Sequence, residues 1–288
     1  MNSYSIFDAH CDTLCHIVDK GGNVIENSWS VDKKRMLTYK KYTQIFACYI
    51  DPQYHNAPKA RFEKLYEAYK AQDFSGINPI MSLEGGEVIE SIEDVDYLNE
   101  CGIKCIALTW NNTNKIAGGV ADPDSGLTEF GKSVIRRMEE LGILVDVSHL
   151  NDKSFYDVAS VATRPIIATH SNSRTICSHR RNLTDDMFKI IRESGGCAGL
   201  NLHTSFLADD DNGTIDDAIK HIEHFMSLDG VDAIGMGSDF DGIPRNPEGI
   251  NGVGELYRLF DKLEEIGTPK DAIDKISHAN FERVFGVV

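Results

Sequence analysis

Short, nearly continuous apolar runs recur along the chain and alternate with longer segments whose apolar residues fall at helical spacing. Strands of parallel sheets that are buried on both faces have apolar side chains at almost every position, as these runs do. The pattern therefore predicts eight strands, at residues 5–10, 43–50, 79–85, 104–110, 143–149, 165–171, 196–202 and 233–239.

The segments between the apolar runs predict helices. Residues 58–73 carry apolar side chains three and four positions apart, which places them on one helical face. Residues 128–141 begin with Thr128, a favoured capping residue, and end before Gly142, a favoured terminating residue. Further helices are predicted at residues 152–162, 184–194, 214–228 and 271–284, and the polar segment 21–41 predicts a long loop with a short helix.

Eight strands that alternate with helices predict an α/β fold, a closed (β/α)8 barrel of the TIM type, with an open doubly wound sheet as the alternative. Barrels of this kind commonly take about 250 residues as one unit. No linker, low-complexity segment or internal repeat divides the chain. We therefore expect residues 1–288 to form a single catalytic domain.

The amino-acid composition argues against nucleic acids and membranes as partners. The chain has 45 acidic and 29 basic residues, and its net charge of −16 would repel the phosphates of nucleic acids. No stretch approaches the roughly 20 apolar residues of a membrane helix, and the first residues lack the basic start of a signal peptide. We expect a cytoplasmic protein that binds neither nucleic acid nor membrane.

Metal-ligand and acid residue types stand at the predicted carboxyl ends of five strands. The active sites of barrel enzymes form at these ends, so side chains that are distant in sequence should meet there. They are His10 and Asp12 after the first strand, Glu84 after the third, His149 after the fifth, His170 after the sixth and Asp239 after the eighth.

The residue types in this group suit a pair of metal ions. Side chains two apart on a strand point the same way, so His10 and Asp12 are expected to bind one metal, and Asp239 and Asp241 have the same relation. Imidazole and carboxylate are ligands of catalytic zinc, and Glu84 is expected to bridge two ions. A metal pair polarises a carbonyl group and deprotonates a shared water molecule.

Each of these residues alone also has a simpler explanation. Glu84 could begin a helix, where a negative charge is favourable, and Asp239 could form a turn. A single histidine at a strand end is more often a hydrogen-bonded core residue than a ligand. The placement of all of them at the ends of separate strands favours the metal site.

Several motifs, taken together, resemble the membrane (renal-type) dipeptidase family of zinc metallopeptidases. They occur in the family's order and cover nearly the whole chain. The motifs are DAHCD, SLEGG, DVSH, the segment from ATHSNSR to HRRN, and GSDFDG followed by IPRNPEG.

The resemblance implies a barrel enzyme that hydrolyses the peptide bond of dipeptides with a hydroxide bridging two Zn2+ ions per chain. It also implies a small peptide as substrate and suggests a homodimer. By motif match, the first zinc would be bound by His10 and Asp12, the second by His149 and His170, and both by Glu84. Asp239 would be the general acid/base, and Arg181 would hold the terminal carboxylate of the substrate.

One position departs from the family pattern. Mammalian members carry a substrate-binding histidine after Leu-Thr at the end of the fourth strand, where this chain has Trp110. We expect Trp110 to pack against the substrate and a nearby asparagine, with Asn112 preferred among Asn111, Asn112 and Asn114, to supply polar contacts. His179 and His203 lie on predicted active-site loops and are further candidates for substrate contact.

Two other functions fit the same residues. The first is a different metal-dependent amidohydrolase on the same barrel, one that acts on N-acyl amino acids, β-lactams or lactones. The second is a non-catalytic protein that keeps a metal site.

Overall fold

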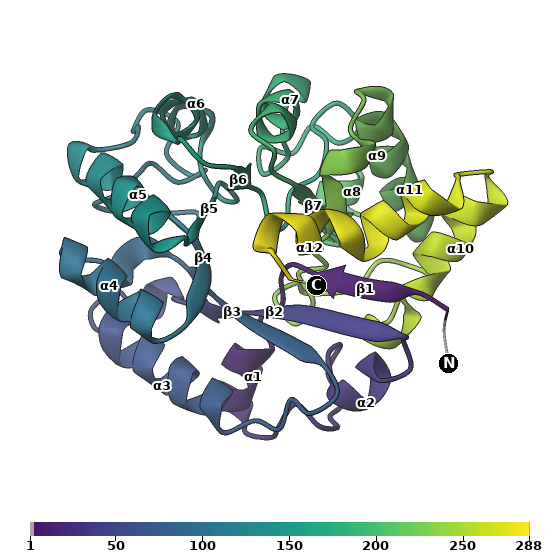
Figure 1. The fold of residues 1–288 in the computed structure, drawn as a ribbon, viewed down its shortest axis with the longest axis horizontal. Helices are drawn as coiled ribbons and strands as arrows, with labels where there is room; N and C mark the ends of the chain where they lie inside the picture. The colour runs from purple at the N-terminus through teal and green to yellow at the C-terminus, as the bar shows by residue number, and fades with distance from the viewer. Residues whose placement is uncertain (1–2, 288) are drawn as a thin grey trace.

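Eight parallel strands form a nearly closed barrel in the computed structural model, which describes residues 3–287 (Figure 1). The strands pair in chain order from β1 to β6, and β8 pairs with both β1 and β7. A bridge joins Ala168, which follows β6, to Ala198, the first residue of β7. They are β1 (Ser5–Asp8), β2 (Lys41–Tyr49), β3 (Asn78–Glu84), β4 (Ile103–Ala107), β5 (Leu144–Asp146), β6 (Ile166–Ile167), β7 (Ala198–Leu200) and β8 (Ile234–Met236). The predicted (β/α)8 barrel and its eight strands are confirmed.

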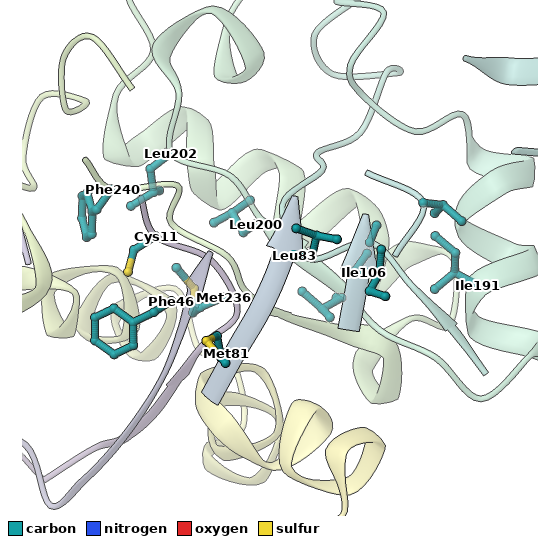
Figure 2. Close-up of a cluster of buried hydrophobic side chains, with 14 of the residues drawn as sticks. Cys11, Phe46, Met81, Leu83, Ile106, Ile191, Leu200, Leu202, Met236 and Phe240 are labelled. Carbon is teal, nitrogen blue, oxygen red and sulfur yellow. The ribbon is translucent and has the colours of Figure 1, made fainter. Parts of the chain in front are cut away.

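The apolar runs form strands because both faces of the barrel wall are buried. On β2, the side chains of the neighbouring residues Ile45 and Phe46 point to opposite faces, and both are fully buried. Ile45 belongs to a cluster with Phe7 of β1 and Ile167 of β6, which fills the inside of the ring. Phe46 belongs to the larger cluster between the strands and the helices, part of which Figure 2 shows.

Most of the helices cover the outside of the ring of strands (Figure 1), whereas Phe281 of the last helix packs into the cluster inside it. The helices are α1 (Thr13–Lys20), α2 (Lys33–Met36), α3 (Pro58–Lys70), α4 (Ile92–Glu100), α5 (Glu129–Leu141), α6 (Asp152–Val161), α7 (Asp185–Glu193), α8 (Thr204–Leu207), α9 (Ile215–Ser227), α10 (Tyr257–Glu265), α11 (Lys270–Asp274) and α12 (Asn280–Phe285). The predicted ends of α5 are confirmed, because the Thr128 side chain accepts from the backbone N–H of Gly131 and Gly142 is left-handed.

The helices differ from the predicted ones in two ways. The single helix predicted at 271–284 is divided into α11, a π-helical turn at Lys275–Ala279, and α12. At the start of α12, the Asn280 side chain donates to the carbonyl oxygens of Val231 and Ile234, which fixes α12 against the start of β8. Helices α1, α4, α8 and α10 are also not predicted from the sequence, although Ser91 and Asp94 form a capping box at the start of α4.

Within residues 3–287, no helix has the length and apolar character that crossing a membrane requires.

Candidate active site

A cavity of about 290 Å3 opens at the carboxyl ends of the barrel strands. Its wall combines carboxylates, imidazoles, aromatic rings and one guanidinium group. The lining residues include Asp12, Tyr49, Glu84, Trp110, Asn111, His149, Arg181, His203, Phe206 and Asp239. The position matches the end of the barrel at which the sequence places the candidate ligands.

His10 and Asp12 meet at the cavity floor, on either side of Cys11, which still forms hydrogen bonds to Ile45 and Ala47 of β2. Strand β1 ends at Asp8, so both residues lie in the loop that follows it. Their loop runs beside the loop after β8, because the N–H of Asp12 donates to the carbonyl oxygen of Phe240. His10 Nε2 comes to rest 3.6 Å from Asp12 Oδ2 and 3.8 Å from Asp239 Oδ1.

Glu84 occupies the centre of the site, and its two carboxylate oxygens face different histidines. Oε2 lies 3.3 Å from His10 Nε2, whereas Oε1 lies 2.8 Å from His149 Nε2 and 3.7 Å from His170 Nε2. Glu84 is the last residue of β3 and is 3 % exposed. One carboxylate thus contacts His10 with one oxygen and His149 with the other.

Hydrogen bonds fix the orientation of the histidines His149 and His170. His149 Nδ1 is 2.8 Å from Asn111 Oδ1, an amide oxygen that only accepts, so Nδ1 carries the hydrogen. Thr169 donates its hydroxyl hydrogen to Asp146, and its oxygen accepts from His170 Nδ1. Both neutral rings therefore present the lone pair of Nε2, and the two Nε2 atoms lie 2.8 Å apart.

This arrangement of imidazole nitrogens and carboxylate oxygens fits metal cations. Two Nε2 lone pairs face each other and a carboxylate oxygen, an arrangement that is repulsive unless a positive charge lies between them. His10 Nε2 and Asp12 Oδ1 are buried and have no hydrogen-bond partner in the described part of the chain. His10, Glu84 and His170 form one candidate ligand group, and His10, Asp12 and Asp239 form another.

Asp239 reaches the site from the turn after β8. The turn brings Gly242 so close that a Cβ there would lie 2.0 Å from Asp12 Oδ2. Asn201, at the end of β7, donates to Asp239 Oδ2 at 2.9 Å and leaves Oδ1 toward His10. Burial, which the negative charges of Asp12 and Glu84 reinforce and His10 partly offsets, raises the pKa of Asp239 to about 7.

Asp241 does not have the strand relation to Asp239 that the sequence predicts. Strand β8 ends at Met236, and both aspartates have left-handed backbone, with φ of 62° and 66°. The Asp241 carboxylate accepts from the Thr13 hydroxyl and the Ser30 N–H. Asp241 therefore ties the turn to α1 and to the loop after it.

Backbone strain concentrates around this cavity. Five non-glycine residues among those the structure describes have positive φ, and three of them are His149, Asp239 and Asp241. Such conformations cost free energy and recur at functional sites, where the surrounding contacts enforce them.

Arg181 provides a buried cation in the wall of the cavity. Its side chain is almost fully buried, and its Nη2 atom has no hydrogen-bond partner within residues 3–287. Its Cζ atom lies 5.5 Å from the centre of the Phe206 ring. Burial lowers the pKa of Arg181 to about 10, so the group stays charged at neutral pH. A buried guanidinium with free donors is suited to bind an anion that enters the cavity.

Residues 59–288 match the family model of membrane dipeptidases, peptidase family M19. The chain belongs to this dipeptidase family. The resemblance inferred from the sequence motifs is therefore confirmed, and with it the assignment to a family of metallopeptidases.

Three individual proteins show how far along the chain the similarity extends. A Klebsiella pneumoniae protein from the pqqA 5′ region is 37% identical over 202 residues, which cover 66% of this chain and 74% of the relative. A Schizosaccharomyces pombe protein named as a dipeptidase is 34% identical over 194 residues, 64% of this chain but only 46% of that protein. A metallopeptidase structure from Rhodobacter sphaeroides, liganded with a phosphinate mimic of the dipeptide L-Ala-D-Ala, is 26% identical, has a TM-score of 0.85 and aligns over 99% of both chains.

At the position where this chain departs from the family pattern, Trp110 lines the cavity. Its ring centre lies 5.6 Å from that of Tyr49 and 6.0 Å from that of His149. The structure does not bring Asn112 to the cavity, since its side chain is exposed and the loop turns Asn111 inward instead. Asn114 also points elsewhere, to Glu87 and the carbonyl oxygen of Leu108.

The sequence did not predict which residues orient the candidate ligands. Asn111, Thr169 with Asp146, and Asn201 do not belong to the predicted ligand set, yet they orient His149, His170 and Asp239. The sequence carries only a weak signal for such a role. Asn201 is a polar residue at the end of an apolar strand, and it therefore belongs to the same edge of the barrel as the ligands.

Proposed function

We propose that this chain is a metal-dependent dipeptidase that hydrolyses the peptide bond of dipeptides in the cavity at the end of the barrel. The observation that carries the proposal is the convergence of oriented histidine lone pairs and Glu84 on one side of the cavity and unpaired Arg181 on the other. The first group suits metal ions, and the second suits the terminal carboxylate of a short peptide. The phosphinate dipeptide mimic bound by the Rhodobacter relative supports this reading.

Two Zn2+ ions are the proposed cofactors. His10 and Asp12 would hold one, His149 and His170 the other, and Glu84 would contribute one oxygen to each, as its two oxygens face the two groups. When bound, such ions polarise a carbonyl group and acidify water, so that hydroxide is available near neutral pH.

Asp239 is proposed to move the proton. Asn201 occupies Oδ2, so Oδ1 is the atom free to accept a proton from the attacking water and to deliver it to the departing amine nitrogen. A carboxylate whose pKa is raised toward neutral pH suits both transfers.

Arg181 is proposed to bind the terminal carboxylate of the substrate and so to set the register of the scissile bond. A guanidinium group makes two parallel hydrogen bonds to a carboxylate. Because this anchor and the proposed metal ligands line the same cavity of about 290 Å3, short peptides fit best.

Arg181→Lys is expected to raise KM for dipeptides about tenfold or more, because a single ammonium group does not replace the two-pronged contact. The matched control is Arg180→Lys, since Arg180 is exposed and lies outside the cavity wall. Steady-state kinetics of both variants test this. An unchanged KM in Arg181→Lys would remove Arg181 from the substrate site.

Asn111→Ala is expected to weaken zinc binding by about 10–100-fold, because His149 would lose the partner that holds its Nδ1–H and orients its ring. Asn112→Ala, the exposed neighbour, serves as control and should bind zinc as the wild type does. Competition with a chromophoric chelator measures both affinities. Equal zinc affinities in the two variants would contradict the role given to Asn111.

A substrate panel on zinc-loaded protein tests the function itself. Free dipeptides are expected to be cleaved, with N-acyl amino acids and β-lactams hydrolysed far more slowly. Preferential turnover of N-acyl amino acids or β-lactams would instead identify another amidohydrolase on this barrel. Metal binding without turnover of any compound would indicate a non-catalytic protein.

The single domain over residues 1–288, the homodimer and the cytoplasmic location stay predictions.

A further inference from the structure

His203 lies in the cavity wall together with Arg181 and Phe206. It follows β7 and caps the short helix α8, where its Nδ1 accepts the backbone N–H of Ser205. The helix cap therefore uses one of the two ring nitrogens. The other, Nε2, makes no hydrogen bond to any residue between 3 and 287, although the ring lines the cavity.

The protonation of the ring follows from the cap. Because Nδ1 accepts a hydrogen bond, the neutral ring carries its hydrogen on Nε2. Burial, followed by the positive charges of His179 and Arg181, lowers the pKa of His203 to about 4. At neutral pH the ring is therefore an uncharged donor with a free N–H.

Phe206 fixes His203 and Arg181 relative to each other. The rings of His203 and Phe206 stack with centres 4.3 Å apart and planes 21° apart, and Arg181 Cζ lies 5.5 Å from the centre of the Phe206 ring. The carbonyl oxygen of Phe206 is held by the buried side chains of Asn172 and Asn182. The two donors are thus positioned before any ligand enters.

We infer that His203 donates its Nε2–H to the terminal carboxylate of the substrate alongside Arg181, and that the pair selects peptides with a free carboxylate. A carboxylate has two oxygens and about four acceptor sites, more than one guanidinium group uses. A neutral imidazole adds a hydrogen bond there without placing a second cation beside Arg181. This role makes His203 a specificity-determining residue, and it rests on the proposed dipeptidase function.

The test compares a dipeptide that has a free carboxylate with its C-terminal amide, in zinc-loaded wild-type protein and two variants. His203→Phe keeps a ring to stack on Phe206 but has no N–H. His203→Gln retains a side-chain amide donor, and it also keeps an acceptor for the cap of α8. The matched control is His224→Phe, because His224 pairs with Asp185 and does not line the cavity.

His203→Phe is expected to raise KM for the free dipeptide about tenfold or more, with little change in kcat and little change in KM for the amide. His203→Gln should recover part of the loss, and His224→Phe should resemble the wild type. The inference is overturned if His203→Phe leaves KM unchanged, or if it raises KM for both substrates by the same factor, which would indicate a role in shape alone. Wild-type protein that cleaves no dipeptide would overturn the proposed function, and this inference with it. The ratio of KM between variant and wild type tests the role of His203 separately.

Discussion

Removal of divalent metal is expected to abolish dipeptide hydrolysis, and added zinc is expected to restore it. The ligand group contains two buried carboxylates, Asp12 and Glu84, and the half-buried carboxylate of Asp239, all of them close to His10. Buried charges of one sign are stable only when an opposite charge compensates them. The family assignment to metallopeptidases leads to the same expectation.

The measurement pairs metal content with rate after exhaustive chelation and after zinc addition. A full rate in protein with no bound metal would refute the metal mechanism. Glu84→Gln sharpens the test, because one Glu84 oxygen faces His10 and the other faces His149. Its substitution should reduce the bound metal below the two ions per chain that we propose. Glu87→Gln, three residues later and outside the cavity wall, is the matched control and should keep its metal.

Asp239→Asn is expected to lower kcat by about 10²–10⁴-fold while zinc content stays unchanged, the range typical for loss of a general acid/base. The amide has nearly the shape of the carboxylate but does not accept and release a proton. The backbone should tolerate the change, because φ at residue 239 is 62° and asparagine is among the residues that adopt this conformation readily. Asn201 can still donate to the amide oxygen.

The matched control for this variant is Asp229→Asn. Asp229 has almost the same backbone conformation, with φ of 59°, but lies in an exposed turn after α9. Kinetics and metal analysis of both proteins separate the possible roles of Asp239. Loss of zinc in Asp239→Asn would make Asp239 a ligand, and an unchanged kcat would exclude it as the acid/base.

Much of the barrel could be predicted because its signals are local. A run such as 43–50 is apolar at nearly every position only if both faces of the strand are buried, and β2 is buried in this way. Capping signals placed the ends of α5 correctly for the same reason, since a cap involves residues three or four apart. The break between α11 and α12 was missed because its partner is the loop before β8, more than forty residues away.

The convergence of the candidate ligands also followed from a general rule rather than from their own spacing. Parallel barrel strands end at one edge, so residues after different strands meet there. The sequence places His10 and Asp12 at the end of the first strand, whereas β1 ends two residues before His10 and the segment after it is held by hydrogen bonds to β2 and to the loop after β8. The convergence of these residues was predictable from the fold, but the backbone contacts that position each of them were not.

The sequence by itself determined the eight strands and their order, the family and the set of candidate ligands, since these depend on periodicity, on motifs and on residue type at strand ends. Only the tertiary structure decided that Asn111 rather than Asn112 supports His149, that Asn201 orients Asp239, and that Arg181 and His203 share the ring of Phe206. These contacts join residues 38 apart in the first two cases, and no local pattern encodes which side chains a closed barrel brings together.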